Sequence, residues 1–465
     1  MLPVFFLIFI LLFVMTAFRP CAFVAGLAFF ATANINASEN HTGASDATVS
    51  DTGKTDYNTI VSESENDYVP VPDEAIVITG GGNGVHRDVM RVLYDTSEMH
   101  FQDASVPRFL MIDRQGNTLF GIGGYVEGVM QYDFAGAIDG ESFITHDISV
   151  PSNPTLRNRL GADATHTNLV FQLLRNTRLG VLNAYVQGNF SGGSYGFKLK
   201  KAYIRLHNVT AGYERSTFED GAAGSPTIDY QGPAGAVSKT NVLLQYRVPL
   251  DKNFTVAISA ELPQADYTLT QGANEAINQR CPDIPAYVQY QWAGGDSHVR
   301  ASALFRQLSY RNLARAENKF ATGWGVQLSG VAKISSIAEV YYQAVYGKGI
   351  ANYINDLADF GYDLISDGAD GKMKAPGSFG VAGGVRLNLS DRVFVSSTYS
   401  FCRLYDQENM GPDAYRRGNY AVVNCFYTPI SDLQVGIEYL HGRRTDMSHE
   451  HGIANRLEAM VKYSF

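Results

Sequence analysis

The chain has 465 residues and a formal net charge of −9, with 18% charged residues and 45% hydrophobic residues, among them 27 Tyr and 26 Phe. So few charges are unusual for a soluble domain, and beyond the N-terminal region no apolar run reaches the roughly 18 residues that a membrane-spanning helix needs. Between Ser38 and Asp103 there are 13 acidic and 3 basic residues, which argues against a nucleic-acid partner. A helical membrane protein is also excluded, and an all-β chain remains.

The N-terminus is typical of an export signal. Residues 1–37 are apolar but carry no Lys or Arg before the first apolar run. A start at Met15 makes Arg19 the positive region, Ala22–Phe30 the apolar core, and Ala33 or Ala37 the residue before cleavage. We therefore expect a signal peptide over residues 1–37, with the true start at Met15; a membrane anchor is the alternative.

A polar leader follows the predicted signal peptide. Residues 38–84 are rich in Ser, Thr, Asp and Asn and end in "ITGGGNG", so we expect an acidic, disordered leader and linker. Without an alternating αβ pattern behind it, the Gly-rich run does not indicate a nucleotide site. Residues 85–117 contain a short amphipathic stretch from Val85 to Tyr94, which predicts a periplasmic segment with a short helix.

From Thr118 onward, apolar and polar residues alternate with a period of two, which indicates β-strands. In "TLFGIGGYVEGVMQYDF" one face carries Phe120, Val126 and Met130, and the other carries Glu127 and Asp133. About 16 such segments recur. They lie at 118–134, 167–176, 181–190, 199–207, 209–215, 241–250, 254–262, 286–292, 299–310, 323–333, 338–346, 379–388, 393–401, 420–427, 433–441 and 456–465.

The connections between these segments alternate between short turns and long loops. "HNVT", "LDKN" and "LSD" are short, whereas 216–238, 263–284 and 347–378 are long. Short turns at one end and long loops at the other are the layout of an outer-membrane barrel, in which closure also removes the exposed sheet edges. We therefore predict an all-β, 16-stranded antiparallel transmembrane β-barrel over residues 118–465, in the lipid of the outer membrane; a soluble sandwich is the alternative.

The last strand, "NRLEAMVKYSF", places Val461, Tyr463 and Phe465 on one face. A terminal strand of this kind resembles the C-terminal signal by which Gram-negative barrel-assembly machinery recognises its substrates. The four cysteines show neither a disulfide framework nor the spacing of a metal site. The run His449–Glu450–His451 falls in a predicted external loop, where we expect no metal and no cofactor.

Several stretches carry a family resemblance. The segments "LGVLNAYVQGNFSGG", "LKKAYIRLHNVTAGYERSTFED", "TIDYQGPAG" and "VGIEYLHGRRTD" resemble those of trimeric, 16-stranded porins of the DcaP-like group. The likeness runs from about Gly121 to Phe465, with "GKGIANYIND" adding to it. It implies a homotrimer, small anionic solutes such as dicarboxylates, and a third long loop that folds into the pore. That loop is 216–238 and carries Glu219, Asp220 and Asp229.

Strand parity places a set of basic residues toward the lumen. A small excess of Lys and Arg in a narrow pore favours anions, so we expect a channel for small hydrophilic solutes with mild anion preference. The alternatives are that these cations pair with lumen carboxylates, or that the barrel is a surface adhesin without an open pore. No catalytic motif indicates an enzyme. The basic candidates are Lys201, Arg205, Arg247, Arg300, Arg306 and Arg386.

Overall fold

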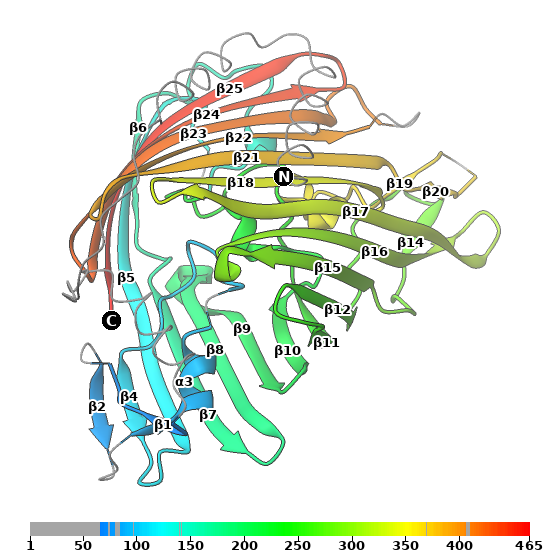
Figure 1. The fold of residues 1–465 in the computed structure, drawn as a ribbon. Coiled ribbons are helices and arrows are strands. Elements are labelled where there is room, and N and C mark those ends of the chain that lie inside the picture. Colours follow the sequence, from blue (N-terminus) through cyan, green and yellow to red (C-terminus); the bar gives the residue numbers. More distant parts are fainter. Residues whose placement is uncertain are drawn as a thin grey trace, which may run out of the picture. The chain divides into compact units, whose positions relative to one another are not determined.

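The computed structural model describes residues 66–72, 75–79, 84–95, 97–138, 140, 142–368, 370–405 and 410–465. The predicted signal peptide, the start at Met15 and most of the leader lie outside these residues. Within the described part, sixteen antiparallel strands close into one barrel, which confirms the predicted fold class (Figure 1). No helix in the described part is both long and apolar enough to cross a membrane.

The barrel strands follow one another in chain order. They are β5 (Thr118–Ala135), β7 (Asn168–Thr177), β8 (Gly180–Gly192), β9 (Gly196–Leu206), β10 (Val209–Arg215), β11 (Thr240–Pro249), β12 (Phe254–Glu261), β15 (Ile284–Trp292), β16 (Ser297–Asn312), β17 (Glu317–Ser335), β18 (Ala338–Lys348), β21 (Gly377–Ser390), β22 (Val393–Leu404), β23 (Tyr415–Ile430), β24 (Leu433–Asp446) and β25 (His451–Ser464).

The predicted alternation of faces is seen in the terminal strands that close the barrel. In β25, Leu457 and Val461 are exposed, whereas Glu458 and Lys462 are buried. β25 pairs antiparallel with β5, so that Lys462 lies opposite Glu127. Because successive side chains of a strand point to opposite faces, the apolar residues face outward and the polar ones face the interior.

Several strands run further than the sequence pattern predicts. β16 and β17 meet at a short turn after Asn312, where a longer loop was expected from residue 312 to 320. Where strands extend outside the membrane, they still pair through ladder hydrogen bonds although their residues no longer alternate between apolar and polar. The sequence pattern therefore ends before the strand does. The long loops also form short strands, namely β6 (Arg159–Asp163), β13 (Tyr267–Thr268), β14 (Asn274–Ala276), β19 (Leu364–Ser366) and β20 (Met373–Lys374).

A small substructure lies at the end of the barrel that carries the short turns, which we call the turn end (Figure 1). It comprises β1 (Tyr68–Val69), β2 (Ile76–Thr79), β3 (Val85–His86), α3 (Arg87–Leu93) and β4 (Phe109–Ile112). Strands β1 and β2 differ from the expected linker over residues 38–84. The reason is burial: Val69 packs with Val85 and Val89, and β2 extends the sheet through β4 to β5.

The opposite, loop end carries five of the six short 3₁₀ turns of the described chain, and the sixth, Ala293–Gly295, forms the short turn between β15 and β16 at the turn end. Those that matter below lie in loops whose apolar residues pack together inside the barrel. Phe143, Phe218, Tyr353 and Leu357 belong to this cluster. The 3₁₀ turns are Thr145–Asp147, Gly193–Tyr195, Gly221–Ala223, Ala293–Gly295, Ala351–Tyr353 and Asn355–Leu357.

Candidate functional site in the barrel interior

The loop between β10 and β11, residues 216–239, contacts strands far from its own ends. We call it the inner loop. The backbone N–H groups of Ile228 and Asp229 donate to the Glu438 carboxylate of β24 at 2.7 and 2.9 Å. The N–H of Gly235 donates to Ser400 of β22, and that of Val237 to Gln343 of β18. These partners belong to several strands, so inward-facing polar side chains satisfy a loop that has no sheet of its own.

The three acids predicted in this loop are buried, and each has a different set of partners. Glu219 pairs with Arg215 at 2.9 Å and accepts the N–H of Lys239. Burial raises the pKa of Glu219 to about 6, although Arg215 acts in the opposite direction. Asp220 contacts His298 at 2.9 Å and accepts a hydrogen bond from Ser329 at 2.7 Å. Burial alone would raise the pKa of Asp220, but Arg300 and His298 hold it well below its usual range.

Asp229, the third acid, is held by a neighbouring external loop and by barrel strand β23. It accepts hydrogen bonds from the N–H of Phe143 at 2.9 Å and from the hydroxyl of Tyr420 at 3.0 Å. Burial raises the pKa of Asp229 despite these two donors. The three acids therefore do not form one cluster.

Three of the predicted basic residues, on β9, β11 and β16, line one cavity and contact carboxylates that precede the barrel. Arg300 of β16 bonds both carboxylate oxygens of Glu98 at 2.9 Å, and Arg247 of β11 approaches the same carboxylate at 3.4 Å. Lys201 of β9 lies 3.3 Å from Asp103. Each of these three cations therefore has a carboxylate partner, but the partners precede the barrel and are not the strand carboxylates expected to face the lumen.

The other three predicted basic residues have different partners, although Arg205 lines the same cavity. Arg306 is fully buried between Asp283 and Asp363, at 3.0 and 2.9 Å. Arg205 donates to Thr210 at 3.0 Å. Arg386 bonds Asn388 at 2.9 Å and lies 3.9 Å from Glu339.

The sequence pattern did not reveal that a segment before the barrel enters its interior. Residues 97–107, which we call the lumen segment, have neither helix nor strand. Phe101 packs edge-on against Phe394 and Phe426 of β22 and β23, with ring centroids 6.0 and 5.3 Å apart. Gln102 donates to the carbonyl of Asp229 at 2.7 Å and accepts from the hydroxyl of Tyr125 at 3.0 Å. A segment without helix or strand has no periodic pattern of apolar residues. Its acidic residues were the one sequence feature that could have indicated a role.

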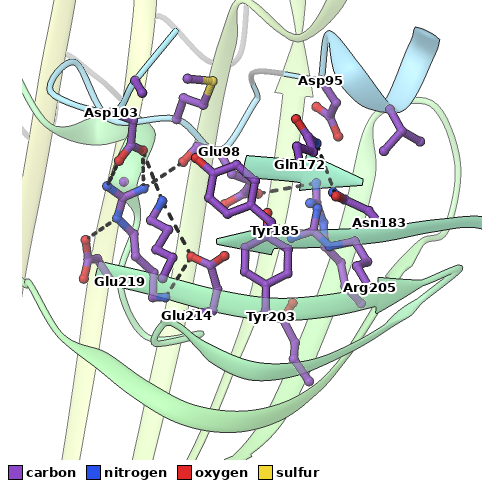
Figure 2. Close-up of a pocket in the computed structure, with 18 of the residues that line it drawn as sticks. Asp95, Glu98, Asp103, Gln172, Asn183, Tyr185, Tyr203, Arg205, Glu214 and Glu219 are labelled. Atoms are coloured by element: carbon purple, nitrogen blue, oxygen red, sulfur yellow. Dashed lines mark hydrogen bonds and ion pairs between the residues drawn. The ribbon is translucent and has the colours of Figure 1, made fainter. Parts of the chain in front are cut away.

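Arg215 was also missed. Strict alternation along β10 would direct only one of two successive residues inward, yet Glu214 contacts Lys201 at 3.7 Å and Arg215 contacts Asp103 at 2.8 Å. Gly212 has a φ of 137°, a conformation that favours glycine, and the alternation is lost after it. Figure 2 shows Asp103, Glu214 and Glu219 converging on the cations between them.

Two polar cavities lie on the two sides of this charge cluster. The first, of about 120 Å³, is on the turn side and is lined by Glu98, Tyr203, Arg205 and Arg247 (Figure 2). The second, of about 190 Å³, is on the loop side and is lined by Gln187, Tyr230 and Gln343. Residues that line both cavities are Asp103, Lys201, Arg215, Glu219 and Gly221.

A family model described as "Porin subfamily" matches residues 116–461, which is most of the chain. The chain belongs to the porin subfamily. The porin resides in the outer membrane of a Gram-negative bacterium, and its family consists of channel proteins. Its turn end is therefore periplasmic and its loop end external. Comparison with curated protein sequences gives no match.

A solved structure shares the fold of this porin, and others align with it less closely. The outer membrane channel DcaP of Acinetobacter baumannii aligns with a TM-score of 0.66 and 20% identity, covering 76% of this chain and 98% of that one, so the porin has a DcaP-like fold. OmpT of Vibrio cholerae aligns at 0.48 and 11%, covering 75% and 98%. An anion-selective porin from Comamonas acidovorans aligns at 0.47 and 10%, covering 75% and 100%.

The predicted C-terminal signal lies at the seam of the porin barrel. Val461 and Tyr463 are exposed on the outer face of β25. Phe465 exchanges backbone hydrogen bonds with Gly124 of β5, at 3.0 and 3.1 Å. The last residue thus completes the pairing between the first and last barrel strands.

Proposed function

We propose that this porin forms a water-filled channel for passive diffusion of small hydrophilic solutes, with a mild preference for anions such as carboxylates. One observation supports the preference most directly. Among the barrel-strand residues that line the periplasmic cavity, Glu214 is the one carboxylate beside five cations. Cations gathered in a low-dielectric wall raise the local concentration of anions. The five are Lys201, Arg205, Arg215, Arg247 and Arg300.

The inner loop is the proposed constriction. Its hydrogen bonds to Gln343, Ser400 and Glu438 hold it against strands on the far side of the interior, and a loop in that position leaves less cross-section for solutes. Glu219 and Asp220 would then be acids of the constriction, whereas Asp229 anchors the loop.

The proposal extends to assembly. The DcaP-like fold supports a homotrimer, and the outward row of Val461, Tyr463 and Phe465 fits recognition by the barrel-assembly machinery. Outer-membrane lipid covers the exposed apolar belt. Native mass spectrometry of the detergent-purified porin tests the trimer, and a monomer alone would contradict it.

Planar-bilayer recording tests the channel and its preference. In a tenfold salt gradient, we expect a reversal potential whose sign shows that anions are more permeant than cations. Arg205→Gln removes a cation that no carboxylate holds in an ion pair among the described residues. It should therefore shift the reversal potential in the direction of lower anion preference. Lys252→Gln, in an exposed turn, is the control and should leave it unchanged. Cation preference of the unmodified porin would overturn the preference, and absence of conductance would favour the adhesin.

A further inference from the structure

The lumen segment supplies carboxylates to cations that the barrel wall would otherwise present to solutes. Glu98 bonds Arg300 and approaches Arg247. Asp103 bonds Arg215 through two hydrogen bonds, at 2.8 and 3.0 Å, and Lys201 at 3.3 Å. Two acids from outside the barrel strands therefore neutralise four of the five cations of the periplasmic cavity.

The second of these acids also lies where the two cavities meet. Asp103, Lys201 and Arg215 line both of them, and the remaining gap is bordered by Glu219 and Gly221. A bidentate guanidinium–carboxylate contact fixes both partners in one plane. The path from the external to the periplasmic cavity is thus crossed by the side chains that hold the lumen segment.

The attachment of the lumen segment differs from that of a barrel strand. Residues 97–107 add no backbone ladder to the wall, and their contacts are individual side-chain bonds together with the backbone carbonyls of Glu98 and Gln102, which accept from Arg215 and Tyr125. The one aromatic anchor is Phe101 against Phe394 and Phe426, and the polar anchor is Gln102. Departure of the segment from the lumen would therefore break no ladder hydrogen bond of the sixteen-stranded barrel.

We propose that the lumen segment determines the conductance and charge selectivity of the porin. When the segment is docked in the lumen, Glu98 and Asp103 neutralise the cations of the barrel wall and interrupt the path between the two cavities. Displaced, the segment leaves Lys201, Arg215, Arg247 and Arg300 facing an open, anion-attracting passage. This inference rests on the proposed channel function, and Glu98 and Asp103 become its selectivity-determining residues.

The test compares two double variants that remove the same net charge from neighbouring parts of the chain. Glu98→Gln with Asp103→Asn removes both lumen carboxylates. Asp88→Asn with Asp113→Asn removes two acids outside the lumen and serves as the control. For the lumen variant we expect at least about a twofold higher single-channel conductance and a several-fold higher anion-to-cation permeability ratio. The control should match the unmodified porin.

Phe101→Ala provides an independent arm, because it removes the aromatic anchor and keeps every charge. It should also raise conductance, and heat-modifiable mobility on gels should show that its barrel is folded. An unmodified porin that conducts with anion preference, and lumen variants identical to it, would overturn the role of the segment and leave the channel function standing. Variants and parent that all fail to conduct would overturn both.

A second inference concerns the outer face of the barrel at its external end. Arg403 of β22 lies directly opposite Arg417 of β23 in the strand register. Arg443 of β24 lies opposite Asn419, two residues along β23 from Arg417. Like charges directly across a strand pair destabilise a sheet. The strand register nevertheless brings these three guanidinium groups together on one outward face of the barrel.

These arginines differ from those of the interior. Arg300, Arg306 and Arg456 all bond carboxylates, whereas the described residues offer Arg403 and Arg443 no ion pair. The Nε atoms of Arg403 and Arg443 are buried and lack a hydrogen-bond partner among the described residues. An unpaired buried donor is unfavourable, so the arrangement favours binding of an anion that the described residues do not supply.

The height of the cluster on the barrel indicates which anion that is. Tyr399 and Tyr439, further down the same faces of β22 and β24, are 52% and 44% exposed. Exposed tyrosines of a barrel mark the boundary between hydrocarbon and headgroups. The arginines lie beyond this boundary, at the headgroup level of the outer leaflet, where lipids of the outer membrane carry phosphate.

We infer that Arg403, Arg417 and Arg443 bind the phosphate of an outer-leaflet glycolipid. Arginine suits this ligand because its guanidinium bonds phosphate in a bidentate manner. The test incubates detergent-purified porin with lipid A, and separately with its dephosphorylated form, and counts bound lipid by native mass spectrometry.

For this second test we expect phosphorylated lipid A to bind and the dephosphorylated form to bind at least about tenfold more weakly. Arg403→Gln with Arg417→Gln should lose most of the binding. Lys319→Gln is the control, because Lys319 lies at the external end of β17 and pairs with Glu317 at 2.7 Å. Equal binding of both lipids, or binding unaffected by the arginine variants, would overturn the site.

Discussion

The guanidinium of Arg215 donates two hydrogen bonds to the carboxylate of Asp103, a residue 112 positions earlier in the chain. This contact joins the lumen segment to the barrel wall at the boundary between two cavities. It sits among Lys201, Glu214 and Glu219, so that two cations face three carboxylates in this cluster.

Removing the cation of this contact should loosen the lumen segment. Arg215→Gln leaves Asp103 buried with Lys201 alone, and breaking a buried pair on one side costs about 3 kcal/mol. We expect faster cleavage within residues 97–107 by a protease added to the purified porin. Arg91→Gln, which removes an exposed ion pair with Asp88, is the control. Equal cleavage rates in both variants would contradict the prediction.

Acid should also release the lumen segment. Burial alone would raise the pKa of Glu98, but Arg300 and Arg247 outweigh burial and Asp220, and hold the pKa at about 2. The ordinary pKa of this carboxyl group is 4.5. The charge of Glu98 therefore stabilises the docked segment fully above pH 4.5, and it does so less and less as the pH falls toward 2. For Asp103, Arg215 and Lys201 likewise outweigh burial, and its pKa lies well below its usual range.

The measurement for this prediction is conductance in planar bilayers between pH 7 and pH 3. We expect a plateau down to about pH 5 and a rise below it. The Glu98→Gln, Asp103→Asn variant lacks both titrating groups and should show no such rise. A rise of the same size in that variant would assign the effect to other carboxylates.

Asp356 gives a pH dependence of the opposite sign. It accepts the N–H of Thr145 at 2.6 Å, joining two external loops. Burial raises the pKa of Asp356 to about 7, with Asp229 adding to the rise and the Thr145 hydrogen bonds opposing it. The pKa of this carboxyl group is higher in the folded than in the unfolded protein, so the folded state binds its proton more tightly. The free energy of unfolding should therefore increase as the pH falls from 8 to 5.

Asp356→Asn keeps an acceptor for Thr145 and removes the buried charge. We expect its thermal midpoint at pH 8 to exceed that of the parent, and the difference to shrink at pH 5. Differential scanning calorimetry in detergent measures both. An Asp359→Asn variant, changed at a neighbouring position of the same loop, controls for the loss of one negative charge.

The seam of the barrel should depend on Gly124. Its φ is 145°, and a Cβ at this position would lie 2.0 Å from the carbonyl oxygen of Asn168. Gly124→Ala should therefore lower the free energy of unfolding by about 3 kcal/mol through backbone strain and the clash. Gly128→Ala, on the same strand with nothing within 4 Å of the added Cβ, is the matched control. Urea unfolding in lipid bilayers compares the two.

The sequence by itself determined the barrel. Alternation in segments such as 456–465, together with alternating turn and loop lengths, predicted the sixteen strands and their outward faces. Both signals are local, because a strand repeats every two residues and a turn is read from its own few residues. The strand pattern also directed Lys201, Arg247 and Arg300 to the interior wall.

Only the tertiary structure decided what those side chains meet. Glu98 lies 202 residues from Arg300, and no pattern relates them. Asp103 and Arg215 come together because an irregular segment enters the lumen and because the alternation of β10 is lost after Gly212. Ion pairs depend on distances that barrel closure and loop packing create, whereas the strands that form the barrel depend on neighbours in the chain.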